Sequence, residues 1–171
     1  MKHNFSLRYG HIILRPLGRK DIEELRVLRN KNKEFFFDSS EITTKQQKEW
    51  YEKYLKKEND IMFAVELAED AGKFIGAIAL YDIDIENGTA ECGRTLIDKE
   101  KAPIKGLGTE ATVAVCHIGF SEFKFKKISG LVLKTNARVL KSDARAGFVI
   151  TGEKDNYFIL EMTPQTIILQ N

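Results

Sequence analysis

The sequence lacks any apolar segment long enough to cross a membrane. Its longest apolar runs, such as residues 61–65 (IMFAV), are far shorter than the roughly 20 residues that a spanning helix needs. The first residues (MKHNFS) contain no apolar stretch of the kind found in a signal peptide. We therefore expect a cytoplasmic protein with no membrane partner.

Proline and cysteine are also scarce. Only three prolines and no low-complexity segment occur in 171 residues, so the sequence offers no linker and predicts one domain over residues 1–171. The two cysteines, Cys92 and Cys116, lie inside expected regular elements and form no CxxC or Cys/His pattern. We interpret them as small buried hydrophobic residues, with a disulfide or a metal site as the alternative, and we expect no metal.

The chain also lacks a large excess of charge of either sign. The chain has 27 Lys and Arg and 25 Asp and Glu residues, interleaved along its length, which gives a net charge of +2. No basic stripe or block stands out, and this argues against nucleic acid as the main partner. With 43% hydrophobic and 30% charged residues, the composition is typical of a globular domain that builds its own core.

The apolar residues follow strand and helix periods in an order that predicts a mixed fold. Turns are expected at Ala71-Gly72 and Asn87-Gly88, and Thr43 or Thr44 is expected to cap the second helix. This order predicts an α/β (α+β) fold with a mixed central sheet and helices on both faces. The expected elements are a strand at His11–Leu17, helices from Asp21 and from Thr43 or Thr44 to about Lys57, strands at Asp60–Leu67, Lys73–Ile83 and Thr89–Ile97, a helix at Thr109–Phe123, a strand at Lys127–Leu133, a helix at Ala137–Ala146, and strands at Phe148–Gly152 and Tyr157–Met162.

The most informative stretch is residues 105–111 (KGLGTEA), which opens the third helix. Glycines at such a junction let the backbone turn tightly, so that free N–H groups of the first helical turn can point at an anion. Lys105 adds positive charge. The stretch lacks the third glycine of a dinucleotide-binding fingerprint and the lysine of a P-loop. It predicts a pyrophosphate cradle, and a simple glycine turn before a helix is the alternative.

The surroundings of this stretch resemble the GNAT superfamily of acetyl-CoA-dependent N-acetyltransferases. Residues 90–97 (AECGRTLI) followed by KGLGTEA are similar to the acetyl-CoA motif near ribosomal-protein-alanine and nucleotide-amino-sugar acetyltransferases. The helix that starts at Asn136 and ends in Gly147-Phe148 resembles a second block of the family. The resemblance covers about residues 10–163. It implies acetyl-CoA as the co-substrate and a sheet that splays at the strand before the glycine loop.

The resemblance also implies which residues hold the coenzyme. In the family, backbone amides at the end of the splayed strand face the pantetheine, and the asparagine of the second block helps to hold the coenzyme. Pro103 and Ile104 depart from the family pattern, which has Gln or Arg and often Gly at these positions. The expected coenzyme-binding residues are Leu96, Ile97, Lys105, Gly106, Leu107, Gly108, Thr109 and Asn136.

The chemistry needs a base, because a neutral amine must attack the thioester. Glu91, on the strand beside the thioester, is the candidate, since burial would raise its proton affinity. A salt-bridged or solvent-facing residue is the alternative. In an ideal strand Glu91 and Arg94 would point to opposite faces unless a bulge intervenes. Asp143 stands where many family members have a tyrosine acid, so no residue is carried over for that role, and we expect no indispensable acid.

The acceptor side is indicated by an unusual aromatic segment. Three adjacent phenylalanines (residues 35–37) lie in a polar stretch, and aromatic rings beside Asp38 suit stacking on a sugar or a nucleobase. The expected substrate-binding residues are Arg29, Phe36, Phe37, Asp38 and Trp50.

We therefore expect a transferase that acetylates a small-molecule primary amine, with the amino group of a nucleotide-linked sugar as one candidate acceptor. The alternatives are a protein N-terminus, an antibiotic or polyamine, and a non-catalytic acyl-CoA-binding module. The protein is expected to be a monomer or a homodimer.

Overall fold

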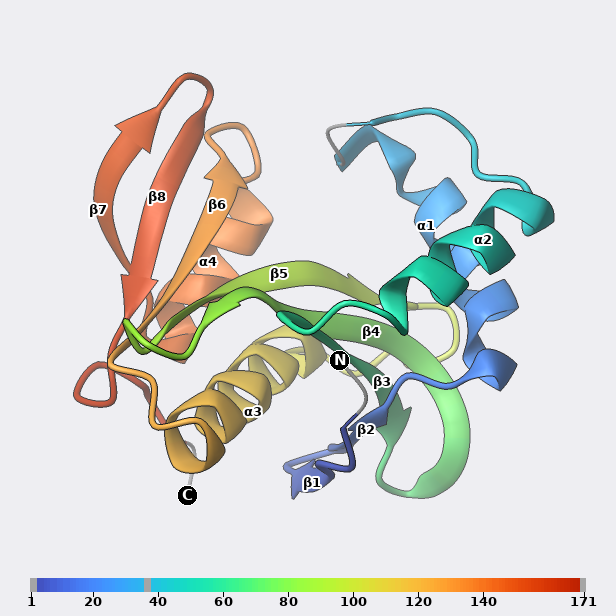
Figure 1. Ribbon diagram of the computed structural model, residues 1–171, viewed down its shortest axis with the longest axis horizontal. Coiled ribbons are helices and arrows are strands. Elements are labelled where there is room, and N and C mark those ends of the chain that lie inside the picture. The colour runs from blue at the N-terminus through green and yellow to red at the C-terminus, as the bar shows by residue number, and fades with distance from the viewer. Residues whose placement is uncertain (1–2, 36–37, 170–171) are drawn as a thin grey trace.

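The computed structural model describes residues 3–35 and 38–169 and shows an eight-stranded sheet with helices on both faces (Figure 1). The strand order is β1-β2-β3-β4-β5-β6-β8-β7, and β5 and β6 are the one parallel pair among these neighbours. The expected mixed fold is confirmed. The elements are β1 (Leu7–Tyr9), β2 (Ile12–Pro16), η1 (Arg19–Asp21), α1 (Ile22–Lys31), η2 (Lys33–Phe35), α2 (Thr44–Tyr54), β3 (Asp60–Leu67), β4 (Asp70–Asp84), β5 (Thr89–Ile97), α3 (Leu107–Glu122), β6 (Lys127–Leu133), α4 (Ala137–Ala146), β7 (Val149–Lys154) and β8 (Tyr157–Met162).

The central strands are buried on both faces because their alternate side chains enter two different cores. On β3, Ile61 and Phe63 belong to the core beneath the sheet, where α3 packs, whereas Met62 and Ala64 belong to the core under α1 and α2. Figure 1 shows α3 on one side of β4 and β5 and the α1–α2 pair on the other. Near-continuous apolar runs in these strands follow directly from this two-sided burial.

Helix α3 is buried almost all round, with 11 of its 16 residues inaccessible to solvent, so it is a central rather than a surface helix. Its one buried carboxylate is satisfied: Glu110 accepts hydrogen bonds from the backbone N–H of His11 and from the His11 ring, both at 2.8 Å. This contact fixes the turn between β1 and β2 against the first turn of α3. The helix start that follows the glycine loop is thereby held rigidly.

The sheet splays between β5 and β6. Their parallel pairing stops at Glu91, opposite Ser129, although β5 runs on to Ile97. The splay thus begins within β5, the strand before the glycine loop, as the resemblance implied. On the other edge of β5, a register shift lies between Ala77 and Ala79 of β4, which is a β-bulge around Arg94.

Several boundaries differ from the expected ones. Strand β1 was not foreseen, because three residues are too few to show a strand period. Helix α2 ends at Tyr54 rather than near Lys57, and α3 begins at Leu107 rather than Thr109. The turn expected at Ala71-Gly72 is wrong: both residues lie in β4, which begins at Asp70, and the turn is formed by Ala68 and Glu69.

Other expectations hold. Thr43 caps α2 and exchanges hydrogen bonds with Gln46. Both cysteines are free and buried, as small hydrophobic residues would be. Within the described ranges, no helix is long and apolar enough to cross a membrane.

Candidate active site

The glycine loop forms an open cradle at the start of α3. Gly106 precedes the helix with φ of +96°, in the left-handed region that glycine adopts without strain, and a Cβ there would meet nothing within 4 Å. The next backbone N–H groups belong to the first helical turn and have no partner within the helix. Lys105 and Gly106 are exposed, whereas the side chains of Leu107 and Thr109 are buried. Leu107 and Thr109 can therefore contribute only backbone groups to a bound anion.

The splay exposes a second set of backbone groups. From Cys92 to Ile97, the edge of β5 that faces β6 has no strand partner in the described chain. An extended ligand can form strand-like hydrogen bonds along this edge, which includes Leu96 and Ile97. A cradle for phosphates at the head of a helix and a free strand edge leading to it fit the shape of a coenzyme A molecule.

Asn136 stands at the start of α4, as the second sequence block indicated. Its side-chain oxygen accepts the N–H of Val139 at 3.2 Å, so the residue caps the helix. The side-chain nitrogen has no partner among the described residues and remains free to donate. Helix α4 is joined to the head of α3 by a hydrogen bond of 2.9 Å between the hydroxyls of Thr109 and Ser142.

Glu91 lies on the sheet face that carries α1 and α2, opposite Tyr81 of β4. Burial raises the pKa of the Tyr81 phenol well above its ordinary value, and the nearby Glu91 carboxylate raises it further. The phenol is therefore neutral and can donate a hydrogen bond. Its oxygen lies over Gly93, where a Cβ would stand only 3.0 Å away. Glu91, Tyr81 and Gly93 together form a polar spot next to the splay.

Arg94 joins this spot because of the bulge. Its φ of +55° is a left-handed conformation that costs a non-glycine residue about 1–3 kcal/mol. The guanidinium lies 4.2 Å from the centre of the Tyr81 ring, and its Nη1 donates to both carboxylate oxygens of Asp60 at 2.9 Å.

Sequence reasoning missed Asp60, Tyr81 and Arg94. One signal was available in the sequence, since Asp60 directly precedes the apolar run of residues 61–65; in the structure its side chain is 3% exposed. A carboxylate so deeply buried requires a cation, because burying an unpaired charge is costly.

Asp143 occupies the opposite side of the splay, on α4. Burial raises the pKa of its carboxyl to about 7, and it has no hydrogen bond or ion pair to any described residue. The pKa of the Cys116 thiol is raised mainly by burial, next by the adjacent Cys92, and also by the charge of Asp143. The carboxyl therefore lies where α3, α4 and β5 meet. At neutral pH it therefore holds a proton part of the time.

The residues expected to bind the substrate differ in their contacts and exposure. Arg29 donates to the backbone carbonyls of Ser40, at 2.6 Å, and of Asp38, so it anchors the segment before α2. Asp38 is exposed and accepts the N–H of Ser40. Trp50 stacks on Tyr54 at 5.6 Å between ring centres. Phe36 and Phe37 lie outside the described residues.

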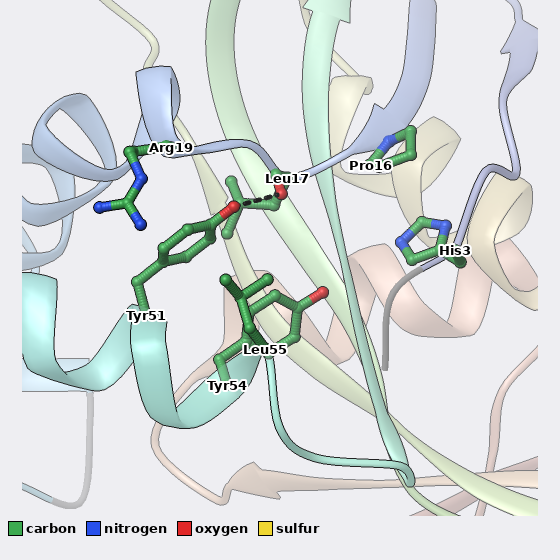
Figure 2. A pocket seen from close by; sticks show the side chains of 7 residues that line it. All are labelled: His3, Pro16, Leu17, Arg19, Tyr51, Tyr54 and Leu55. Atoms are coloured by element: carbon green, nitrogen blue, oxygen red, sulfur yellow. Dashed lines mark hydrogen bonds between the residues drawn. The ribbon is translucent and has the colours of Figure 1, made fainter.

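Two surface cavities lie away from this region. The first, of about 300 Å³, is formed beside α2 by residues that Figure 2 shows around Tyr51, whose hydroxyl donates to the Leu17 carbonyl at 3.5 Å. The second, of about 260 Å³, lies between α1 and the loop after β5. Neither includes Glu91 or the glycine loop, so we assign the active site from the splay and its side chains. Among the described residues, no cluster of three or more His, Cys, Asp or Glu side chains could hold a metal ion.

A mixed sheet splayed at one parallel pair, with a glycine-led helix at the splay, defines an acyl-CoA-dependent transferase fold. Comparison with protein families bears this out: the profile of the acetyltransferase (GNAT) domain matches residues 11–149. The chain belongs to this GNAT acetyltransferase family, whose members use acetyl-CoA. Comparison with curated protein sequences gives no significant match.

Solved structures share the fold over nearly the whole chain. Apo FdhC, described as a nucleotide-linked sugar GNAT, is 24% identical, with a TM-score of 0.84 over 96% of this chain and 93% of its own. Spermidine N-acetyltransferase from Vibrio cholerae, solved with CoA and spermine, is 20% identical, with a TM-score of 0.78 over 91% of this chain and 97% of its own. A GCN5-related N-acetyltransferase from Brucella melitensis is 18% identical, with a TM-score of 0.77 over 96% of this chain and 81% of its own. At these identities the likeness establishes the fold.

Proposed function

We propose that this protein transfers the acetyl group of acetyl-CoA to the primary amine of a nucleotide-linked amino sugar. The observation that carries the proposal is the polar spot of Glu91 and Tyr81, which adjoins the splay on the face opposite α3. An acceptor on this face and a coenzyme in the splay would meet at the free edge of β5.

Acetyl-CoA supplies an activated acetyl thioester at this edge. The Glu91 carboxylate accepts a proton from the acceptor ammonium, either directly or through a water, so that the amine becomes a nucleophile. The Tyr81 hydroxyl, kept neutral by burial, holds the amine or that water by a hydrogen bond. The amine then forms a C–N bond with the thioester carbonyl, the C–S bond breaks, and the second proton of the amine is released to water. On the other side of the splay, the protonated Asp143 carboxyl gives its proton to the departing thiolate. One carboxylate therefore accepts a proton from the amine, and a different carboxyl donates a proton to the thiolate.

The choice of a nucleotide-linked sugar rests on two supports. FdhC, with the same fold over nearly the full chain, is a nucleotide-linked sugar GNAT. The connection before α2, part of which Arg29 anchors, includes Phe35, which is 51% exposed. Aromatic surface of this kind suits stacking on a sugar or base. The segment belongs to the connection between α1 and α2, which lie on the same sheet face as Glu91.

The test is thiol release from acetyl-CoA with a panel of acceptors. The panel contains nucleotide-linked amino sugars, the corresponding free amino sugars, spermidine, and a peptide with a free N-terminus. We expect turnover with the nucleotide-linked amino sugars at a kcat/KM at least tenfold above every other class. Turnover confined to spermidine or to the peptide would replace this proposal with that acceptor. Tight coenzyme binding without any turnover would indicate a non-catalytic module.

A further inference from the structure

Arg94 is placed on the acceptor face by a local irregularity of β5. In a regular strand, residues 91 and 94 point to opposite faces. The bulge opposite Ala77–Ala79 and the positive φ of Arg94 turn its side chain onto the face that carries Glu91. Bulges that re-aim a side chain are over-represented next to active sites.

The guanidinium of Arg94 is fixed by its contacts, and some of its N–H groups have no partner among the described residues. Its Nη1 donates hydrogen bonds to Asp60, and the guanidinium group lies over the Tyr81 ring. Of its five N–H donors, those on Nε and Nη2 have no partner in the described part of the chain. The side chain is 33% exposed, so these donors are within reach of a ligand.

The charges around Tyr81 are separated. The Glu91 carboxylate lies beside its hydroxyl, whereas the Arg94 guanidinium lies over its ring. Asp60 is shared by two cations, because the Lys57 ammonium also lies 3.3 Å from it. The Arg94 end of the spot is therefore positive and the Glu91 end negative. This pattern complements a ligand that has an amine at one end and an anion a few ångströms away.

We propose that Arg94 selects the acceptor by binding its phosphate while the acceptor amine lies at Glu91. A guanidinium with two free N–H groups on one edge matches two phosphate oxygens, which a lysine cannot do. A polyamine would instead bring a second cation to the positive end of the spot. This inference rests on the proposed function and specifies which part of the acceptor is recognised.

The test compares a nucleotide-linked amino sugar with the same amino sugar lacking the nucleotide. In Arg94→Gln we expect the KM for the nucleotide-linked acceptor to rise at least tenfold, with a small change in kcat and an unchanged KM for acetyl-CoA. The preference over the free amino sugar should fall by the same factor. Arg94→Lys should recover only part of it. The matched control is Arg8→Gln, which removes the same charge from an exposed residue of β1.

A binding measurement makes the result independent of turnover. Uridine diphosphate is titrated into the full-length protein at saturating coenzyme A, which blocks the cradle at Gly106. We expect binding to the unaltered protein and to Arg8→Gln, and at least tenfold weaker binding to Arg94→Gln, measured well below its Tm, which should fall because the buried Asp60 loses its arginine. Equal binding by all three proteins, or none by any, would overturn the role of Arg94. Turnover of spermidine alone would instead overturn the proposed acceptor class, so the two failures are distinguishable.

Discussion

Replacing Asp143 by Asn should make the protein more stable at alkaline pH, which is unusual for the loss of a charged group. Burial raises the pKa of this carboxyl from 3.8 to about 7. The folded state therefore binds the proton more tightly than the unfolded state, and stability is lost as the pH rises from about 4 through about 7. The full shift of roughly 3 pKa units corresponds to about 4 kcal/mol, at about 1.4 kcal/mol per unit.

Partial exposure of the Asp143 side chain reduces this figure, because solvent screens the charge. We therefore expect Asp143→Asn to raise the free energy of unfolding by about 1–3 kcal/mol at pH 8 and by close to zero at about pH 3, below the unfolded pKa. The amide has nearly the shape of the carboxyl and no charge at any pH. Removing the proposed acid should also lower kcat about tenfold or more at pH 7.

The assay is urea denaturation of both proteins, without coenzyme, at half-unit steps from about pH 3 to about pH 8.5. The two stability curves should coincide at about pH 3 and separate between about pH 4 and about pH 7. A constant offset across this range, or a less stable variant at pH 8, would refute the reasoning that Asp143 is buried without a partner. Full activity of the variant at pH 7 would refute its role as an acid while leaving the stability argument intact.

Two further predictions concern the coenzyme loop and the base. Gly106→Ala should weaken acetyl-CoA binding at least tenfold in calorimetry. The control is Gly72→Ala, near the start of β4, where φ is also +96° and the surroundings are equally open; it should cost a similar stability and leave binding unchanged, whereas equal affinities of the two variants would place the pyrophosphate elsewhere. Glu91→Gln should lower kcat/KM about 100-fold at pH 7, and the deficit should shrink as rising pH supplies neutral amine; a pH-independent deficit would indicate a positioning role.

Much of the fold could be predicted because each central element carries its own signal. The Asn87-Gly88 turn and the glycine before α3 mark boundaries through their backbone conformations, with φ of +70° at Gly88 and +96° at Gly106. The parallel pairing of β5 with β6 follows from the helix between them. Strand β1 could not be foreseen, because three half-exposed residues have no period to read.

The proposed coenzyme side of the site could be located from the sequence, because the proposal depends on backbone groups next to glycines. The acceptor side could not. Asp60, Tyr81 and Arg94 lie on three different strands, and they meet only because β3, β4 and β5 are neighbours in the sheet. No local pattern reports a contact between residues so far apart in the chain.

The bulge at Arg94 links these two halves of the site. Beyond it, β4 and β5 approach so closely that a Cβ on Gly76 would stand 2.0 Å from the Leu96 carbonyl oxygen. The close contact with β4 fixes one edge of β5 over Leu96 and Ile97, while the other edge is left free by the splay. The same extra residue turns Arg94 toward Tyr81. The bulge on one edge of β5 and the splay on its other edge therefore lie on the same short stretch of strand, which brings the arginine proposed to bind the acceptor close to the strand edge proposed to bind the coenzyme.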